Sequence, residues 1–417
     1  MLHFSPSDGH TGAGGAAARI HQGLLTRGVD SRFCVVHSTV GLENSFTPQI
    51  SLFGRVVRKA RRTFDDWMIR RVAKRYDYLL STGACGFNIA KIVLRERPDI
   101  VQLHLMGFNA FRLATLSGVR KPVVWRFPDQ WAFCGLPHYE PNPDNYTAPP
   151  PLNLNWSRPW TNLSEHVRYK KSKTYSSIDR LVVVCPSRWL AAETKSSALL
   201  GNRPIELIPT SCDTALFSPK DRNVCRAALG LSLDAYIVLV GAGSLELRSK
   251  GLDLFLEAMG NIGKQPPAGH ALEIVTFGKD AFNAARLGNC ARVSHLGHVA
   301  DRRLLSIIYN AADVFAAPSR MENLANTVLE SLACGTPVIA FDVGGMPDAI
   351  EHRVNGYLAP PFNTEAFADG IRWCLAQRDR EDIRIACREK VLNGFSREQE
   401  IDRFISLYES LLCQPRR

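Results

Sequence analysis

Two glutamates in the C-terminal half lie in a segment whose pattern is typical of a phosphate-binding site. The segment runs from Pro318 to Pro337 and reads PSRMENLANTVLESLACGTP. The apolar run Val314–Ala317 predicts a strand before it, and residues 325–334 predict a helix that the following Gly-Thr-Pro ends. Amide groups at the start of such a helix, together with its dipole, favour a diphosphate. The strand-loop-helix order also puts this start at the carboxyl end of a sheet, where open α/β sheets bind ligands.

The two carboxylates occupy different parts of this segment, because Glu322 lies on the predicted loop and Glu330 inside the predicted helix. They need not share one helix face and can bracket an elongated ligand. A carboxylate has two acceptor oxygens, which suits the vicinal hydroxyls of a sugar or a ribose. On an arbitrary helix two glutamates eight residues apart are usually solvated; the strand-loop-helix context favours the binding interpretation here.

The elements that must position this site form two consecutive α/β series. The first opens as a β-α-β unit, with a short strand at Leu2–Phe4, a glycine-rich loop at Ser5–Gly15, a helix at Ala16–Arg27 and a strand at Arg32–Val36. Its further strands are predicted at Ile100–Leu105, Val123–Phe127, Leu181–Cys185 and Ile205–Ile208. The strands of the second series are predicted at Tyr236–Gly241, Glu273–Gly278, Val293–Leu296, Val314–Ala317 and Val338–Phe341.

Helical stretches between these strands predict an α/β fold with two parallel sheets, each covered on both faces. A chain of 417 residues exceeds what one core usually organises. We therefore expect one domain at residues 1–207, a second at 208–395, and a last helical segment at 396–417. The apolar stripe of that last helix, from Phe404 to Leu412, needs a surface to cover it.

Several segments resemble glycosyltransferase family 4, the retaining enzymes with an E-x7-E signature, and they occur in the family's order. They are Gly12–Ala17, Val184–Leu190, Ile208–Phe217, Lys250–Gly251, Glu322–Glu330, Gly344–Asp348 and Asn355–Gly356. The resemblance is most specific from Ala311 to Pro361 and is closest to the branch that builds bacterial surface polysaccharides. It implies the GT-B fold, with an N-terminal acceptor domain and a C-terminal nucleotide-sugar donor domain. These two Rossmann-like domains would face each other across a cleft, and a C-terminal helix would cross back to the N-terminal domain.

The resemblance also implies roles for individual residues of the donor site. Glu330 would bind the nucleotide ribose, Glu322 would contact the donor hexose, and Lys250 would neutralise phosphate charge. Gly14 and Gly15 would let the N-terminal loop approach the donor closely. Contacts to the sugar and diphosphate, and then to the base, would come from Asn323, Leu324, Asn326 and Thr327, and from His298 and Val299.

Chemistry with retention is typical of this family. The departing diphosphate takes the acceptor's proton on the same face of the sugar ring, so the protein mainly stabilises the leaving group. Lys250 and the helix that starts near Asn326 fit that task. The chain contains no Asp-x-Asp motif, so we expect neither a metal clamp on the diphosphate nor another cofactor.

Two positions depart from the family's pattern. Pro128 replaces a histidine that directly precedes an aspartate in related sequences and usually lies near the donor's reacting carbon. The arginine that usually accompanies the phosphate-binding lysine is absent between Ala242 and Ser244, and Arg248 is the candidate substitute.

Residues after Pro128 are candidates for the acceptor side, with Asp129 as a third catalytic candidate beside Glu322 and Lys250. Asp129 and Trp131 lie at the end of a predicted strand. They are either acceptor-site residues or a turn carboxylate and a core aromatic residue. His138 and Tyr139 in the following loop are further candidates for acceptor contact.

The formal net charge of +11 raises the question of an anionic partner. Nucleic acid is not expected, because no aromatic platform interleaves with the basic residues. The densest basic stretch, residues 55–75, predicts either an amphipathic helix on an anionic membrane or a solvated helix face. No run of about 18–20 apolar residues and no signal peptide is evident. We therefore expect a cytoplasmic protein that binds the inner face of the membrane peripherally.

Three classes of function are compatible with the sequence. The first is a metal-independent hexosyltransferase that uses a UDP- or GDP-sugar and a growing or lipid-linked glycan. The second is a non-catalytic nucleotide-sugar-binding subunit of a glycan-assembly complex, which the departures at Pro128 and the missing arginine motivate. The third is an NAD-dependent oxidoreductase, since Gly12-x-Gly14-x-x-Ala17 fits the dinucleotide fingerprint. The strand at Arg32–Val36 does not end in the acidic residue that this fingerprint requires.

Overall fold

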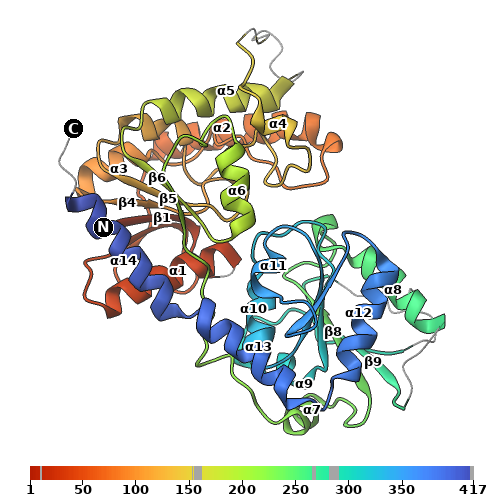
Figure 1. The fold of residues 1–417 in the computed structure, drawn as a ribbon. Coiled ribbons are helices and arrows are strands. Elements are labelled where there is room, and N and C mark those ends of the chain that lie inside the picture. The colour runs from red at the N-terminus through yellow and green to blue at the C-terminus, as the bar shows by residue number, and fades with distance from the viewer. Residues whose placement is uncertain (10–11, 153, 155–161, 265–268, 281–290, 414–417) are drawn as a thin grey trace. The chain divides into compact units, whose positions relative to one another are not determined.

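The chain folds into two α/β units, shown as ribbons in Figure 1. The computed structural model describes residues 1–417 except 10–11, 153, 155–161, 265–268, 281–290 and 414–417. Unit 1 comprises Met1–Pro209 and Glu400–Arg417, and unit 2 comprises Thr210–Gln399. Neighbouring strands pair in parallel in both sheets, which confirms the predicted α/β class with two Rossmann-like domains.

The sheet of unit 1 has seven strands in the order β3-β2-β1-β4-β5-β6-β7. The order changes direction between β1 and β4, which makes this pair the topological switch point of the sheet. The strands are β1 (Leu2–Ser7), β2 (Arg32–His37), β3 (Ser45–Phe46), β4 (Val101–Leu103), β5 (Val123–Arg126), β6 (Leu181–Cys185) and β7 (Ile205–Leu207).

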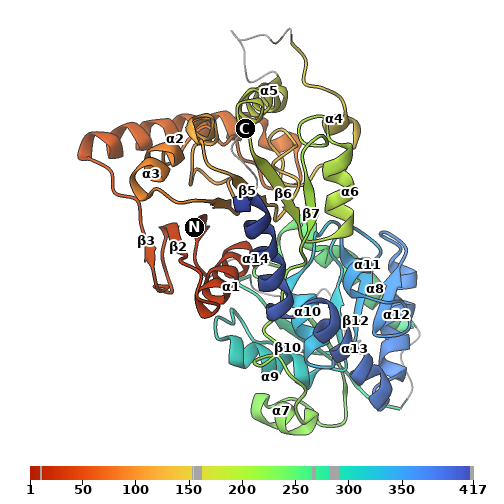
Figure 2. The same ribbon diagram turned by 60° about the vertical axis from the view of Figure 1, so that its left-hand side comes forward.

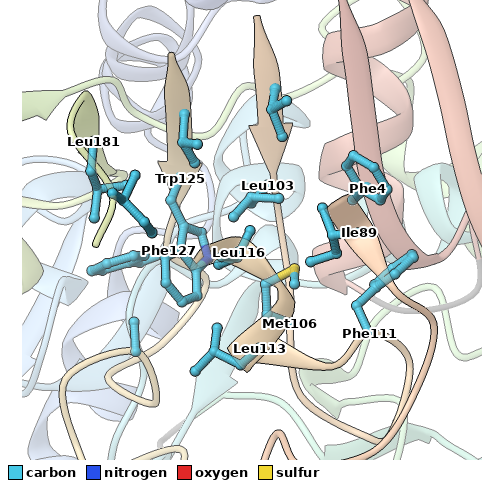
Figure 3. Packing of buried hydrophobic residues seen from close by; sticks show 14 of the residues in the cluster. Phe4, Ile89, Leu103, Met106, Phe111, Leu113, Leu116, Trp125, Phe127 and Leu181 are labelled. Carbon is cyan, nitrogen blue, oxygen red and sulfur yellow. The ribbon is translucent and has the colours of Figure 1, made fainter. Parts of the chain in front are cut away.

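Helices cover both faces of this sheet. They are α1 (Gly12–Thr26), α2 (Leu52–Val72), α3 (Ile89–Glu96), α4 (Asp144–Thr147), α5 (Leu163–Ser176), α6 (Arg188–Ser196) and α14 (Arg397–Cys413), with 3-10 turns η1 (Ala73–Arg75) and η2 (Leu113–Gly118). Figure 3 shows the core on the α3 and η2 side, where Phe4, Leu103 and Trp125 of the sheet pack with Ile89 and Leu116.

The opposite face of the sheet is covered by α1 and α14, which lie side by side in Figures 1 and 2. Phe404, Tyr408 and Leu411 of α14 are buried against Ile20 of α1 and Val124 of β5. The helix that begins after Ser396 therefore covers the N-terminal sheet, as the family resemblance implies, although Leu412 of the predicted stripe is exposed.

The sheet of unit 2 has six strands in the order β10-β9-β8-β11-β12-β13, with its switch point between β8 and β11. The strands are β8 (Tyr236–Gly241), β9 (Leu272–Phe277), β10 (Arg292–His295), β11 (Val314–Ala317), β12 (Val338–Phe341) and β13 (Gly356–Ala359). The helices and one 3-10 turn are α7 (Arg222–Leu229), η4 (Arg248–Lys250), α8 (Leu252–Lys264), α9 (Arg302–Ala311), α10 (Asn326–Ala333), α11 (Met346–Ala349), α12 (Thr364–Ala376) and α13 (Glu381–Gly394). Figure 1 shows α9, α10 and α13 on one face and α8 and α12 on the other.

Several local predictions for the first strand and helix are wrong. Strand β1 continues to Ser7, because it lies between β2 and β4 and its serines pair with Val35 and His37. This pairing outweighs the weak strand preference of serine and proline. The predicted glycine-rich loop is shorter than expected, since Gly12 already begins helix α1 and Gly14 and Gly15 lie in its first turn.

Two short edge strands, β3 and β13, were not predicted. Strand β13 begins at Gly356, where a Cβ atom would lie 2.2 Å from the carbonyl oxygen of Val338 on β12. Glycine permits this close approach of two backbones. Gly356, which the sequence analysis noted only for its resemblance to the family, therefore begins an edge strand.

Candidate functional site

The switch point of unit 2 brings Lys250 and Glu322 together. Strands β8 and β11 are hydrogen-bonded neighbours, so the loops that follow them leave the same carboxyl edge of the sheet. Lys250 comes from η4 after β8, and Glu322 comes from the loop between β11 and α10. Their side chains form an ion pair between Lys250 Nζ and Glu322 Oε2, and both remain partly exposed. Open α/β sheets bind their ligands at this position.

One set of contacts fixes the Lys250 turn on the Glu322 loop. Gly251 has φ +67°, and a Cβ atom there would lie 1.9 Å from the carbonyl oxygen of Pro318. Arg320 N donates to Ser249 O at 2.8 Å, and the Arg320 guanidinium binds both oxygens of Asp253 at 2.6 Å. A two-pronged arginine–carboxylate pair of this kind fixes orientation as well as distance. Sequence reasoning missed Arg320 and Asp253, although each lies within three residues of a predicted site residue.

A second glycine fixes Glu322 from the opposite side. Gly344, in the loop after β12, has φ +56°, and a Cβ atom there would lie 1.8 Å from the carbonyl oxygen of Glu322. Gly345 N donates to the same carbonyl oxygen at 3.1 Å. Gly344 is therefore part of the site's support, because only glycine tolerates both its positive φ and this close approach.

Glu330 is anchored on the neighbouring helix α9. Tyr309 Oη donates to Glu330 Oε2 at 3.2 Å, and an Arg302 nitrogen lies 3.9 Å from Glu330 Oε1. Burial, followed by the nearby charge of Glu330, raises the pKa of Tyr309 well above its usual value, so the phenol stays a donor. Arg302 also lies 3.6 Å from the carboxylate of Asp213. Glu330 is thus a positioned carboxylate, and Tyr309 and Arg302 are support residues that the sequence did not reveal.

The start of helix α10 lies between the two glutamates in the chain. Its N-cap residue is Ala325, which has no side chain able to cap the first-turn amide groups. Asn326 and Thr327 open the helix and are half-buried, whereas Asn323 and Leu324 before it are buried. The loop and the first turn of α10 therefore have the geometry that favours an anion.

The other donor-site candidates of unit 2 differ in how far they are exposed. Arg248 is an exposed residue at the start of η4, and its carbonyl oxygen accepts a hydrogen bond from Arg320 at 3.2 Å. His298 after β10 is exposed, and Val299 is half-buried against the apolar core that also contains Leu324.

Gly14 and Gly15 belong to unit 1 and lie in the first turn of α1. A Cβ atom on Gly15 would lie 3.5 Å from the nearest atom, Gly9 O, which is an ordinary contact. Packing within the described part of unit 1 therefore does not require glycine at position 15.

The residues after β5 form a separate polar cluster in unit 1. Asp129 Oδ2 lies 2.7 Å from His138 Nδ1, and Asp129 Oδ1 accepts from the Trp131 amide at 3.0 Å. Trp131 is 2% exposed, and its indole donates to Ser81 O at 2.8 Å. This burial supports the interpretation of Trp131 as a core aromatic residue. His138 is buried, and Tyr139 is half-buried with its ring edge against Tyr78.

Comparison with known proteins identifies relatives of this chain. Residues 236–377 match the family model described as glycosyl transferases group 1. Two curated relatives are D-inositol 3-phosphate glycosyltransferases. The Jonesia denitrificans protein is 31% identical over 219 residues, which is 49% of this chain and 51% of that protein. The Mycobacteroides abscessus protein is 32% identical over 210 residues, which is 49% of this chain and 46% of that protein. The chain spans about half the length of the curated relatives it matches.

Solved structures resemble the whole chain in fold. Sucrose-phosphate synthase from Thermosynechococcus elongatus matches with a TM-score of 0.68 and 17% identity, over 99% of this chain and 98% of that one. The Anabaena protein HepE, solved in complex with UDP, matches with a TM-score of 0.65 and 17% identity, over 98% of this chain and 99% of that one. HepE was also solved with UDP-glucose, and that structure matches with a TM-score of 0.63.

Proposed function

We propose that this protein is a retaining glycosyltransferase, because residues 236–377 match the family model of the group 1 glycosyl transferases and the whole chain has a GT-B fold of two Rossmann-like domains. It moves a hexose from a UDP- or GDP-sugar to a growing polysaccharide or a lipid-linked glycan. The observation that carries the proposal is the cluster at the switch point of unit 2, where Lys250 and Glu322 are paired beside the start of α10.

The cluster offers a partner for each part of a nucleotide-sugar. Lys250 and the first turn of α10, with Asn326 and Thr327, bind the diphosphate, and Arg248 supplies additional positive charge. Glu322 and the backbone at Asn323 and Leu324 bind the hexose hydroxyls. The carboxylate of Glu330, held by Tyr309, accepts hydrogen bonds from the ribose.

The remaining donor contacts are proposed from the family resemblance. His298 and Val299 flank the base, and Gly14 and Gly15 let the start of α1 approach the donor without a Cβ atom in the way. Asp129, with its partner His138, belongs to the acceptor side. The UDP complexes of HepE support a uridine nucleotide as the first donor to test.

The proposed reaction needs no metal ion. The bond between the hexose C1 and the diphosphate oxygen breaks, and a bond between C1 and the acceptor oxygen forms on the same face. The acceptor's proton goes to the departing diphosphate. Lys250 and the α10 dipole stabilise the negative charge that develops there. Transfer should therefore persist in EDTA, and its loss, restored by Mg²⁺ or Mn²⁺, would contradict this part of the proposal.

A donor screen tests the proposal. A ligand that binds only the folded protein raises its melting temperature. UDP-hexoses and GDP-hexoses are compared for this stabilisation, and the best donor is assayed for hydrolysis and transfer. Glu330→Ala should weaken donor binding about 10- to 100-fold, because charge-assisted hydrogen bonds to the ribose are lost. Glu365→Ala, at an exposed position of α12, is the matched control. The proposal fails if no donor stabilises the protein or if Glu330→Ala leaves binding unchanged.

A non-catalytic nucleotide-sugar-binding subunit is the second candidate function. It is favoured by Pro128 at the position of the family's histidine and by the missing arginine before Ser244. The two functions share the donor site and differ in turnover. Stabilisation by a nucleotide-sugar without hydrolysis or transfer, with glycan acceptors present, would favour the subunit.

Helix α2 supports a peripheral attachment to the inner face of an anionic membrane. Leu52, Phe53, Val56, Phe64 and Trp67 are exposed, and their spacing puts them on one face of the helix. Basic side chains flank this stripe, among them Arg55, Lys59, Arg62 and Arg70. An apolar stripe flanked by arginine and lysine is typical of a helix that lies in the membrane interface. None of the described helices is long and apolar enough to cross a bilayer.

Vesicle binding tests this attachment. Arg58 stacks on Phe87 with 4.3 Å between its guanidinium carbon and the ring centre, so reversing its charge would also disturb packing. Charge reversal at the exposed Lys59, Arg61 and Arg62 should release the protein from vesicles that contain anionic lipid, since each basic residue near the surface contributes about 1 kcal/mol. Unchanged sedimentation with the vesicles would contradict the attachment.

A further inference from the structure

The loop after β4 is held in a strained backbone conformation at the switch point of unit 1. Phe108 and Asn109 have φ angles of +59° and +57°, and neither is glycine. Such left-handed residues cost about 1–2 kcal/mol each, and they cluster at ligand sites when the surroundings hold them in place. The buried side chains of Met106 and Phe111 anchor the loop at its two ends (Figure 3). Its place beside β1 is where open α/β sheets bind ligands.

A chain of three polar side chains fixes this loop. The Phe108 amide donates to Ser81 Oγ at 3.0 Å, and Ser81 Oγ lies 2.9 Å from His138 Nε2. His138 Nδ1 lies 2.7 Å from Asp129 Oδ2. These contacts fit a neutral His138 ring with its proton on Nδ1. Such a ring donates a hydrogen bond to Asp129 and accepts one from the Ser81 hydroxyl. The polar cluster after β5 therefore determines where Phe108 lies.

Glycine at position 107 allows the loop to pack this closely. A Cβ atom on Gly107 would lie 2.8 Å from Ser81 Oγ and 2.9 Å from His138 Cε1. Any side chain at this position would push the loop away from the serine and the histidine. The close packing of the loop on these two side chains thus limits the freedom of Phe108.

Three stacked rings connect the exposed surface with the core. The Phe108 ring stacks on His138 with a centroid distance of 4.6 Å and an interplanar angle of 16°. His138 stacks on Trp131 at 5.9 Å and 17°, and Lys171 Nζ lies 3.7 Å from the Trp131 ring centre. His138 and Trp131 are each 2% exposed, whereas Phe108 is 45% exposed. The stack therefore ends in the exposed ring of Phe108, and the buried ring of His138 fixes its position.

We propose that Phe108 is a stacking platform for a pyranose ring of the acceptor glycan. The face of an aromatic ring carries negative partial charge, which attracts the polarised C–H groups on the apolar face of a pyranose. A fixed ring binds better than a mobile one because less conformational entropy is lost. The inference rests on the proposed function, since it names the acceptor's sugar ring as the group bound at the carboxyl edge of unit 1.

Saturation-transfer NMR with methyl pyranosides, in the presence of UDP, tests the platform. The methyl α-glucoside, α-galactoside and α-mannoside serve as probes. In the unaltered protein, the ring C–H protons of at least one glycoside should receive saturation. Phe108→Ala should weaken this binding about three- to tenfold, in the range of a single aromatic contact. Phe108→Tyr should retain it and Phe108→Leu should not, because leucine is apolar but has no ring face.

Phe362 provides a matched control, since it is also an exposed phenylalanine with a left-handed backbone, at φ +62° in unit 2. Phe362→Ala should leave glycoside binding unchanged. Ser81→Ala, which removes the acceptor of the Phe108 amide, should weaken glycoside binding without changing stabilisation by UDP. Glycoside signals that are absent, or unchanged in Phe108→Ala, would overturn the platform while UDP still binds. If no UDP- or GDP-hexose stabilised the unaltered protein, the proposed function itself would be overturned.

Discussion

At the scale of single residues, the ion pair between Lys250 and Glu322 sets the electrostatics of the donor site. A diphosphate and Glu322 compete for the same ammonium group. The pair is partly exposed, so its own contribution is small, about 0–1 kcal/mol. Glu322 therefore weakens the attraction of Lys250 for a bare nucleotide slightly, while its second oxygen can still bind a sugar hydroxyl.

We expect Glu322→Gln to affect nucleotide binding and sugar transfer in opposite directions. UDP should bind as tightly as before or up to about fivefold more tightly, because Lys250 loses a competing partner. Transfer from the UDP-hexose should fall about 10- to 100-fold in kcat/KM, because charge-assisted bonds to the hexose hydroxyls are lost. Calorimetric titration with UDP and steady-state kinetics measure the two effects.

Lys250→Met is the matched comparison for this prediction. It removes the charge that binds the diphosphate, so both UDP and the UDP-hexose should bind more weakly. If Glu322→Gln weakened UDP as much as Lys250→Met does, Glu322 would be a support for the lysine and not a sugar-binding group.

Residues that contact the proposed ligand could be predicted from the sequence, whereas the residues that support them could not. Glu322 and Glu330 could be selected because their spacing and context match a known signature. Arg320 with Asp253, and Tyr309 with Glu330, are pairs separated by 67 and 21 residues. Their contacts exist only because β8 neighbours β11 and α9 packs beside α10. Strand order was not available from the sequence, so these supports could not be predicted.

At the scale of elements, the glycine loop after β12 holds the Glu322 loop in place. Gly344→Ala adds a Cβ atom 1.8 Å from Glu322 O at a position with φ +56°. The left-handed backbone costs an alanine about 1–2 kcal/mol. In addition, the clash between the new Cβ atom and Glu322 O must move the loop that carries Glu322. We expect kcat/KM to fall at least about tenfold, since small displacements of a positioned group have large effects on rate.

Gly230→Ala separates backbone strain from displacement of the site. Gly230 has φ +66°, at the end of α7, and nothing lies within 4 Å of its Cβ position. Both variants should lose a few degrees of melting temperature, about 2–4 °C for each kcal/mol. Only Gly344→Ala should lose activity. Equal activity of the two variants would show that Gly344 does not position Glu322.

Burial alone does not fix where a strand begins and ends. Strands β6, β8, β11 and β12 have the predicted bounds, whereas the fully buried β9 is shifted by one residue and β4 is shorter than predicted. Strand β1 was predicted too short because Ser5 and Ser7 become strand residues only through their neighbours. The first turn of α1 was assigned to a loop because its glycines are weak helix formers.

At the scale of the whole molecule, the resemblance to group 1 glycosyl transferases is confirmed over residues 236–377, and the surface-polysaccharide branch stays a prediction. The predicted fold class of two Rossmann-like domains is also confirmed, because two alternating series of strands and helices have few ways to fold. The identity of the donor and of the acceptor could not be predicted in this way. They depend on a few side chains at the loop ends rather than on the pattern that forms the sheets.

Buried histidines make the stability of unit 1 depend on pH. His3 of β1 and His104 after β4 are buried, with His3 Nδ1 lying 3.0 Å from His104 Nε2. Burial lowers the pKa of both rings well below the usual value. Repulsion by His104, His21 and the N-terminus adds to this for His3, and repulsion by Arg126 and His21 adds to it for His104. The unfolded chain therefore binds protons that the folded unit excludes.

We expect the free energy of unfolding to fall as the pH drops below about 6.5, by about 1.4 kcal/mol per pH unit for each histidine. The sign follows because proton binding favours the unfolded state whenever the folded pKa is lower. Urea unfolding followed by tryptophan fluorescence measures this, since six of the seven tryptophans belong to unit 1 and only Trp373 to unit 2.

Two variants check that these histidines cause the pH dependence. His104→Gln should reduce the slope of the unfolding free energy against pH by the contribution of one histidine. His37→Gln, at the exposed end of β2, should leave it unchanged. A slope that is the same in His104→Gln would assign the effect to other groups.

The way α14 packs has a consequence for how the protein is made. Residues 401–411 cover Val124 and Val182, yet they leave the ribosome more than 200 residues after those strands. Unit 2 can be complete while the part of the N-terminal sheet that α14 covers is still exposed. We expect the nascent chain to expose this apolar surface until residues 401–411 have been translated.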